Sequence, residues 1–308
     1  MSHAHPGHAG DTARRAARRP ERAYVLGMAL NLGFVAAEVG FGFYANSIAL
    51  LADAGHNLSD VLGLGLAWGA SLLARRPPAG RFTYGLRGST IWAALANALA
   101  LLVATGAIAW EAVLRIAQPA AVAGATVIAV ALAGVAVNAG TAALFLRAQR
   151  EDLNARGAFL HLAADAAVSL AVAGSGAAIL WTGMDWIDPA MSLVVAALIV
   201  ASTWGLLREA LALALHSAPR SIALAEVRRY LCGLPGVAGV HDLHVWAMST
   251  SENALTAHLV MPAGHPGDAF LERVAEELRA RFLIGHPTLQ VELGDPGHPC
   301  CLEPEETV

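Results

Sequence analysis

Six long apolar stretches constrain this 308-residue chain more than any other feature. A helix needs about 20 mostly apolar residues to cross the hydrocarbon core of a bilayer. Hydrophobic residues make up 56% of the chain and charged residues only 14%, which is outside the usual range of water-soluble domains. The sequence therefore predicts a membrane domain of six helices, at residues 23–45, 48–73, 89–114, 122–146, 158–182 and 187–212.

Arginine is distributed unevenly among the short connecting segments, or joints, between these stretches. The joints at Arg75–Arg87 and Arg147–Arg156 are basic, whereas those near residues 46, 119 and 184 contain almost no arginine. Because cytoplasmic joints of membrane proteins carry the excess of basic residues, the two basic joints and both termini are expected in the cytoplasm. The segment at residues 1–22 is rich in His and Arg and has no apolar core, so a cleaved secretory signal is not expected. The absence of lysine is typical of a GC-rich bacterial genome, which favours the bacterial inner (plasma) membrane.

Beyond residue 219 the pattern changes to short alternating and amphipathic segments, which predicts a second domain. The alternation typical of half-buried strands occurs at Gly239–Met248, Ala254–Met261 and Thr288–Leu293. Helical periodicity occurs at Ser221–Leu231 and Asp268–Phe282. This α-β-β-α-β order favours a small α+β domain with helices on one face of an open sheet.

The predicted fold class is therefore an all-α membrane domain of six helices followed by a small cytoplasmic α+β domain. The expected domain boundaries are a disordered N-terminal tail at 1–22, the membrane domain at 23–215, the cytoplasmic domain at 216–296 and a C-terminal tail at 297–308.

The pattern His-x-x-x-Asp occurs in two of the predicted spans, as His56 with Asp60 and as His161 with Asp165. Residues four apart share one face of a helix. Two such helices packed face to face offer two imidazoles and two carboxylates, a donor set that suits tetrahedral Zn²⁺. Ionisable residues at membrane depth are costly and usually mark a functional pathway. We therefore expect these four residues to form a metal site inside the membrane.

The alternative explanation for these residues is that they form structural buried pairs, or that the spacing arises from composition. The repetition of the motif in two apolar spans weighs against it. Asp53 is left outside the expected site and is predicted to face a mouth of the pathway or to cap the helix. Hydrogen bonding between helices explains the presence of Glu38, another acidic residue in a span, without a role in transport. If Glu38 faces the cavity, it is expected to join the proton path.

Five segments follow one another in an order that carries further information. They are Ala49-Leu-Leu-Ala-Asp-Ala-Gly-His56-Asn-Leu-Ser-Asp60, Tyr84-Gly-Leu-Arg87, Glu111-Ala-Val-Leu-Arg115, Asp188-Pro189 and His241-Asp-Leu-His-Val-Trp246. These segments resemble the signature stretches of the cation diffusion facilitators, specifically the zinc-exporting bacterial branch, and the resemblance covers residues 23–295. It implies a homodimer that exports Zn²⁺ from the cytoplasm in exchange for protons, with a role in metal homeostasis and resistance.

The same resemblance implies that His56, Asp60, His161 and Asp165 are the transport site. Family members with Asp in place of the first His tend to accept a wider range of metals. His56 therefore favours zinc as the transported substrate, with cadmium as a companion.

The resemblance also implies a cytoplasmic metal site formed by His241 and His258 on neighbouring strands, Glu292 on the last strand and Cys301 in the tail. Imidazole, carboxylate and thiolate are good Zn²⁺ donors, so Zn²⁺ is expected as a regulatory ligand as well. Ordinary surface histidines are the alternative explanation. Cys300, next to Cys301, is the alternative cysteine ligand for this site.

Two residues close to His241 are expected to play no part in this site. His244 and Trp246 are predicted on the opposite face of the strand, because side chains alternate along a strand.

The expected partners are divalent metal ions, protons, the lipid bilayer and a second copy of the chain, without nucleic acid. Two other functional classes stay open. An intramembrane metalloenzyme would need an open coordination position, but the sequence contains neither His-Glu-x-x-His nor Gly-x-Ser-x-Gly. A metal-sensing membrane receptor would have no need of four ligands inside the membrane. The chain is therefore expected to be a transporter and not an enzyme.

Overall fold

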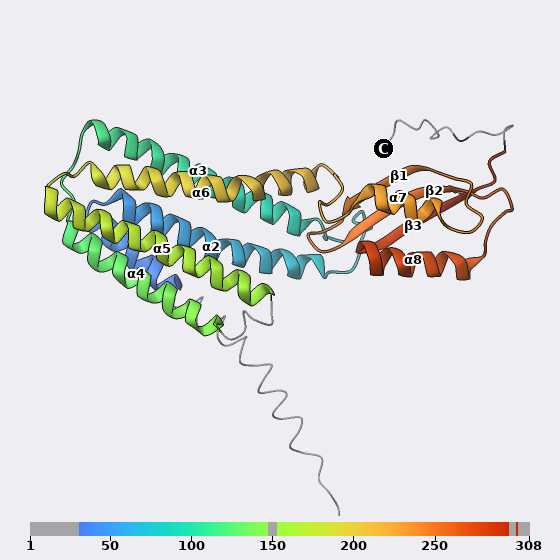
Figure 1. The fold of residues 1–308 in the computed structure, drawn as a ribbon, viewed down its shortest axis with the longest axis horizontal. Coiled ribbons are helices and arrows are strands. Elements are labelled where there is room, and N and C mark those ends of the chain that lie inside the picture. Colours follow the sequence, from blue (N-terminus) through green and yellow to red (C-terminus); the bar gives the residue numbers. More distant parts are fainter. Residues whose placement is uncertain (1–30, 147–152, 296–299, 301–308) are drawn as a thin grey trace, which may run out of the picture. The chain divides into compact units, whose positions relative to one another are not determined.

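The computed structural model describes residues 31–146, 153–295 and 300 (Figure 1). Within these residues, five helices are long and apolar enough to span a membrane: α2 (Ile48–Ala74), α3 (Ser89–Ala117), α4 (Gly124–Phe145), α5 (Leu153–Thr182) and α6 (Ile187–Ala214). Residues 31–44 are also helical, and the beginning of the first predicted span, from residue 23, lies outside the described residues. Five of the six predicted spans are thus confirmed as apolar helices.

The helices expose large apolar side chains over much of their surface. Trp68, Trp110 and Trp181, for example, are 68%, 67% and 90% exposed. Water-soluble proteins rarely expose so much contiguous apolar surface. A lipid environment accounts for it, and the chain is therefore a multi-pass membrane protein.

Contacts divide the chain into two compact units. One draws on Met1–Gly65 and Asn97–Trp204, and the other on Leu66–Ala96 and Gly205–Val308. The core of the first unit is formed by small and branched side chains such as Leu50 of α2, Val127 of α4 and Val172 of α5, all fully buried.

Helices α4 and α5 approach one another through glycine. A Cβ atom on Gly124 would lie 2.9 Å from the backbone oxygen of Gly176, and one on Gly176 would lie 3.0 Å from the backbone oxygen of Gly124. Small residues at such positions let two membrane helices pack backbone against backbone. Any larger residue at either position would force the two helices apart.

A carboxylate from α6 caps the N-terminus of α2. Asp188 is fully buried and accepts hydrogen bonds from the Ser47 hydroxyl, from the Ile48 N–H at 2.7 Å and from the Ala49 N–H at 3.3 Å. An acceptor with negative charge at this position satisfies free N–H groups and interacts favourably with the helix dipole. The cap fixes the start of the helix that carries the first His-x-x-x-Asp motif.

The C-terminal domain contains α7 (Leu224–Cys232), β1 (Gly239–Ala247), β2 (Asn253–Val260), α8 (Asp268–Phe282) and β3 (Ile284–Glu292), as Figure 1 shows. The sheet order is β1-β2-β3, with β1 antiparallel and β3 parallel to β2. One core joins the sheet to both helices, with Val227 and Leu231 from α7, Val274 and Leu278 from α8, and Leu255 from β2. The predicted α+β order, with helices on one face, is confirmed, although β3 begins before the predicted Thr288.

Strand β1 contains a bulge. His241 pairs with His258, but the next pair joins His244 to Thr256, so β1 has one residue more than β2 between the two pairs. Asp242, inside this interval, has a φ of +49°, in the left-handed region. An extra residue in a strand increases its local twist and changes which way the following side chains point.

The bulge reverses the alternation of side chains along β1. Val240 before the bulge and Leu243 after it are both buried in the core, which places His241 and His244 on the same outer face. The prediction that His244 and Trp246 lie opposite His241 is therefore wrong. It assumed a strand of unbroken period two, which the inserted residue interrupts.

Candidate metal centres

The two His-x-x-x-Asp motifs meet across α2 and α5. The Nε2 atom of His56 lies 3.4 Å from Oδ1 of Asp165, and Nε2 of His161 lies 3.2 Å from Oδ2 of Asp60. Within each motif the corresponding distances are 3.9 Å on α2 and 3.6 Å on α5. Each histidine therefore lies closer to the carboxylate of the other helix than to that of its own motif.

The four side chains are not equally enclosed. One donor atom from each of His56, Asp60 and Asp165 lies within 4.8 Å of the others, a spacing that one metal ion can bridge. His161 contacts both carboxylates, but its ring centroid lies 6.2 Å from that of His56 and its side chain is 49% exposed. Three donors are assembled, and a small movement of His161 would add the fourth.

Asp53 occupies a different position from the one predicted. It is fully buried, and its Oδ2 atom accepts a hydrogen bond of 2.9 Å from the Ser169 hydroxyl of α5. The expectation that Asp53 faces a mouth of the pathway or caps the helix is wrong, because sequence spacing does not reveal which neighbouring helix meets a given face.

Glu38, in the helical residues 31–44, is also fully buried. Its Oε2 atom accepts a hydrogen bond of 3.3 Å from the Asn57 amide of α2. The prediction that hydrogen bonding between helices involves Glu38 is confirmed.

A second cluster of metal-binding groups lies on the outer face of the sheet. His241 and His258 are cross-strand partners, and the two oxygens of Glu292 lie 3.2 Å from His241 Nε2 and 2.8 Å from His258 Nδ1. The Cys300 Sγ atom lies 3.6 Å from His258 Nδ1. One donor from each of the four residues lies within 4.8 Å of the others.

The charge state of Glu292 suits a metal ligand. Partial burial raises its pKa, but hydrogen bonds with the Cys300 thiol and the Gln290 amide, together with the neighbouring imidazoles, outweigh this effect. The net result is a pKa below the usual value for glutamate. The group is therefore a carboxylate at neutral pH, which is the form that binds metal.

The structure modifies the predicted membership of this cluster. Cys301 lies outside the described residues, and its role stays a prediction, whereas the neighbouring Cys300 is in the cluster. Asp242 was missed: its Oδ2 atom lies 3.5 Å from His258 Nε2, and its Oδ1 atom lies 2.9 Å from His244 Nε2. Its position depends on the bulge, which no sequence pattern indicated.

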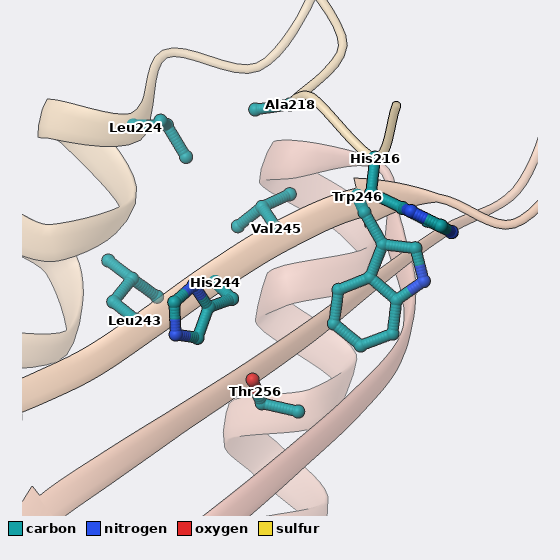
Figure 2. Close-up of a pocket in the computed structure, with 8 residues that line it drawn as sticks. All are labelled: His216, Ala218, Leu224, Leu243, His244, Val245, Trp246 and Thr256. Atoms are coloured by element: carbon teal, nitrogen blue, oxygen red, sulfur yellow. The ribbon is translucent and has the colours of Figure 1, made fainter. Parts of the chain in front are cut away.

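A hollow beside β1, in the same unit, offers a third group of histidines (Figure 2). Its lining residues are His216, Ala218, Leu224, Leu243, His244, Val245, Trp246 and Thr256. Figure 2 shows the His216 imidazole and the Trp246 indole at one end of the hollow. Since no carboxylate or thiol belongs to this lining, it is a poorer metal site than the cluster on the sheet.

Apolar helices that carry imidazoles and carboxylates, followed by a small α+β domain with a second group of metal donors, define a class of membrane protein equipped to handle metal ions. The family model of the cation efflux transmembrane domain matches residues 24–213, and that of the cation efflux protein cytoplasmic domain matches residues 219–293. The chain belongs to the cation efflux family, the cation diffusion facilitators, and the resemblance noted from its motifs is confirmed.

Several bacterial proteins are similar to this chain over most of their length. It is 38% identical over 271 residues to the zinc transporter ZitB of Escherichia coli (strain K12), covering 87% of this chain and 86% of the relative. It is 33% identical over 293 residues to the metal cation efflux system protein CzcD of Cupriavidus metallidurans, covering 95% and 89%. A cadmium, cobalt and zinc/H(+)-K(+) antiporter of Bacillus velezensis is 31% identical over 271 residues, covering 86% of each chain.

Proposed function

We propose that this protein is a proton-coupled antiporter that exports divalent metal ions from the cytoplasm, with Zn²⁺ as its main substrate and Cd²⁺ as a second one. The observation that carries the proposal is the meeting of His56, Asp60, His161 and Asp165 between two apolar helices, α2 and α5. Two nitrogen and two oxygen donors suit tetrahedral Zn²⁺. Membership of a cation efflux family supports a transporter in place of an enzyme. The names of the relatives support zinc, cadmium and proton coupling.

The contacts between the helices supply a mechanism for exchange. Histidine must be neutral and aspartate ionised to bind a metal ion, so metal binding releases protons. In the metal-free arrangement a proton on each imidazole is held by the carboxylate of the other helix. Zn²⁺ that arrives from the cytoplasm takes the place of these protons. When the site opens to the outside, the higher proton concentration there recharges the histidines, which change charge near neutral pH, and the metal leaves.

The membrane topology is part of the proposal. The first span extends over residues 23–45 to give six spans, and both termini lie on the cytoplasmic side of a bacterial inner membrane. The arginines of the joints support this orientation. The proposal also includes domain boundaries at residues 23–215 and 216–296, and the family matches at residues 24–213 and 219–293 support them.

The cytoplasmic domain is proposed to sense metal and to hold the homodimer together. His241, His258 and Glu292, with a cysteine from the C-terminal tail, would bind a regulatory Zn²⁺ and tighten the dimer. The mixed donor set within 4.8 Å supports this role. No nucleic-acid partner is proposed.

Transport by purified protein in lipid vesicles tests the proposed function. With an acidic lumen, Zn²⁺ added outside should enter the vesicles while protons leave them, because molecules with their cytoplasmic face outward exchange the two ions. Fluorescent indicators for zinc and for pH inside the vesicles measure both movements. A membrane receptor or an intramembrane metalloenzyme would move neither ion, so a folded protein without zinc uptake would contradict the proposal.

A further inference from the structure

Glu38 and Asp53 form a buried acidic pair that the exchange of metal at the four-residue cluster does not use. Glu38 belongs to the helical residues 31–44 and Asp53 to α2, and both are 0% exposed. The Asn57 amide donates to Glu38, and Asp53 lies four residues before Asn57 on the same face of α2, which makes the two carboxyl groups neighbours. A hydrogen bond between two carboxyl groups requires a proton on one of them, because an ionised carboxylate is an acceptor only.

The hydrogen bonds around this pair are incomplete. One oxygen of each carboxyl group has a donor, from the Asn57 amide to Glu38 and from the Ser169 hydroxyl to Asp53. The other oxygens, Glu38 Oε1 and Asp53 Oδ1, have no donor among the described residues. The Oδ1 atom of Asn57, which is also fully buried, lacks a partner within the same part of the chain. Three buried oxygens of this group thus have no donor among the described residues.

The charges around the pair favour a proton on one of the two carboxyl groups. The titratable groups that act on Asp53 from outside the pair are His56 of α2 and Asp165 of α5. From helix α4, Gly134 faces Ser169: a Cβ atom on this glycine would lie 3.1 Å from the Ser169 hydroxyl oxygen. Two neighbouring carboxylates in a buried site disfavour each other's ionisation, and the histidine that acts on Asp53 also faces Asp60 and Asp165.

We propose that Glu38 and Asp53 are a proton-binding site that holds one proton between them and releases it to the cytoplasm when a divalent cation binds nearby at His56 and Asp165. The release breaks one carboxyl O–H bond and leaves one additional negative charge on the pair. The positive charge of the bound metal stabilises that charge. This inference rests on the proposed function, because it adds a proton carrier to the same transport cycle.

A monovalent cation such as K⁺ is the other ligand that an all-oxygen group of this kind could bind. Of the oxygens in this group, only Glu38 Oε1, Asp53 Oδ1 and Asn57 Oδ1 lack a donor among the described residues, whereas larger cations such as Ca²⁺ take six or more. The proton is therefore favoured, and the experiment separates the two.

The test counts the protons released per zinc ion by the full-length protein in detergent. Calorimetric titration with Zn²⁺ in two buffers of different ionisation enthalpy gives this number. Glu38→Gln, Asp53→Asn and the double variant keep the size of each side chain and remove the exchangeable proton. We expect each variant to release about one proton fewer than the wild type. The matched control is Thr141→Val, which removes a buried hydroxyl that donates to the Val137 carbonyl oxygen in the same helix, α4, and it should release the wild-type number.

Infrared difference spectra of the wild type provide a measurement that needs no variant. Zinc binding should remove the C=O band of a protonated carboxyl group, and Thr141→Val should retain this change. A wild-type spectrum without such a band, or a double variant that releases as many protons as the wild type, overturns the inference.

The outcomes separate this inference from the proposed function. Zinc transport by the wild type with an unchanged proton count in the double variant contradicts only the acidic pair. A wild type that neither binds nor transports zinc contradicts both. Zinc-dependent K⁺ movement that the double variant loses, at an unchanged proton count, would replace the proton by a monovalent cation.

Discussion

The Nε2 atom of His161 lies 3.2 Å from Oδ2 of Asp60 on the neighbouring helix, closer than the 3.6 Å that separates it from Asp165 in its own motif. His56 shows the reciprocal preference for Asp165. Each carboxylate thus holds the histidine of the other helix. Removing one carboxylate should therefore disturb both halves of the site and not only the helix on which it lies.

Asp60→Ala or Asp165→Ala should abolish zinc transport while leaving a folded, membrane-inserted dimer. Either change removes one of the four proposed metal ligands, and zinc affinity should fall by at least about 100-fold, the upper end of the loss caused by removing an outer-shell partner. Zinc resistance of a zinc-sensitive host and vesicle uptake both measure the effect. Glu209→Ala, which removes an exposed carboxylate from α6, is the control. Normal resistance conferred by either aspartate variant would show that these residues do not bind the transported ion.

His241→Ala combined with His258→Ala should weaken zinc-dependent compaction of the dimer and leave measurable transport. These side chains belong to the cytoplasmic cluster and lie outside the apolar helices. Small-angle scattering with and without Zn²⁺ measures the compaction, and His265→Ala, at an exposed position, should behave like the wild type. Complete loss of transport in a well-folded double variant would mean that the cytoplasmic cluster is essential for the pathway itself.

His56→Asp should keep transport but raise the uptake of cadmium and other divalent ions relative to zinc. The change replaces a nitrogen donor by a harder and more adaptable oxygen donor, and ligand type and geometry determine which metal is accepted. It also removes a group that changes charge near neutral pH, so the pH dependence of export should shift as well. Competition assays at two external pH values measure both. If neither the zinc-to-cadmium ratio nor the pH profile changes, His56 does not contact the ion.

Cys300→Ser should weaken the binding of Zn²⁺ and Cd²⁺ by the cytoplasmic domain more than Cys301→Ser does. The thiol of Cys300 lies 3.6 Å from His258 Nδ1, and soft metals prefer sulfur to the hydroxyl that replaces it. Calorimetric titration of both variants with Cd²⁺ compares them directly. The reverse order of affinities would assign the ligand to Cys301.

Asp188→Ala should lower the stability of the membrane domain by about 1–3 kcal/mol, because it leaves buried donors at the start of α2 without an acceptor. Ser47→Ala removes only one of the bonds to this carboxylate and should cost less. Thermal unfolding in detergent measures both variants. Equal midpoints for Asp188→Ala and the wild type would exclude a role of the carboxylate as a helix cap.

The sequence alone was enough to predict those features that follow the period of a single helix or strand. The limits of α8 agree with the predicted Asp268–Phe282, and the four-residue spacing of His161 and Asp165 placed both on one face of α5. Long apolar runs likewise located α2 to α6, since span length is set by the thickness of the bilayer.

The remaining features depend on contacts between different helices or strands, and the periodicity within one helix or strand does not reveal such contacts. Asp53 has Ser169 as a partner only because α5 packs against α2 at this point, and the sequence around Asp53 does not reveal that contact. Asp242 reaches His258 because one inserted residue turns the strand. Such positions become visible only when the partner element is in place.

The close contact between Gly124 and Gly176 has a consequence for motion within the bundle. Gly176 and His161 are separated by about 22 Å along α5, at 1.5 Å per residue. If α5 tilted by about 5° about this contact, His161 would move by about 2 Å at this lever length. His161 is the donor that lies furthest from completing the cluster on α2 and α5. A tilt at the glycine contact would therefore turn a slight change in helix angle into the gain or loss of the fourth proposed ligand.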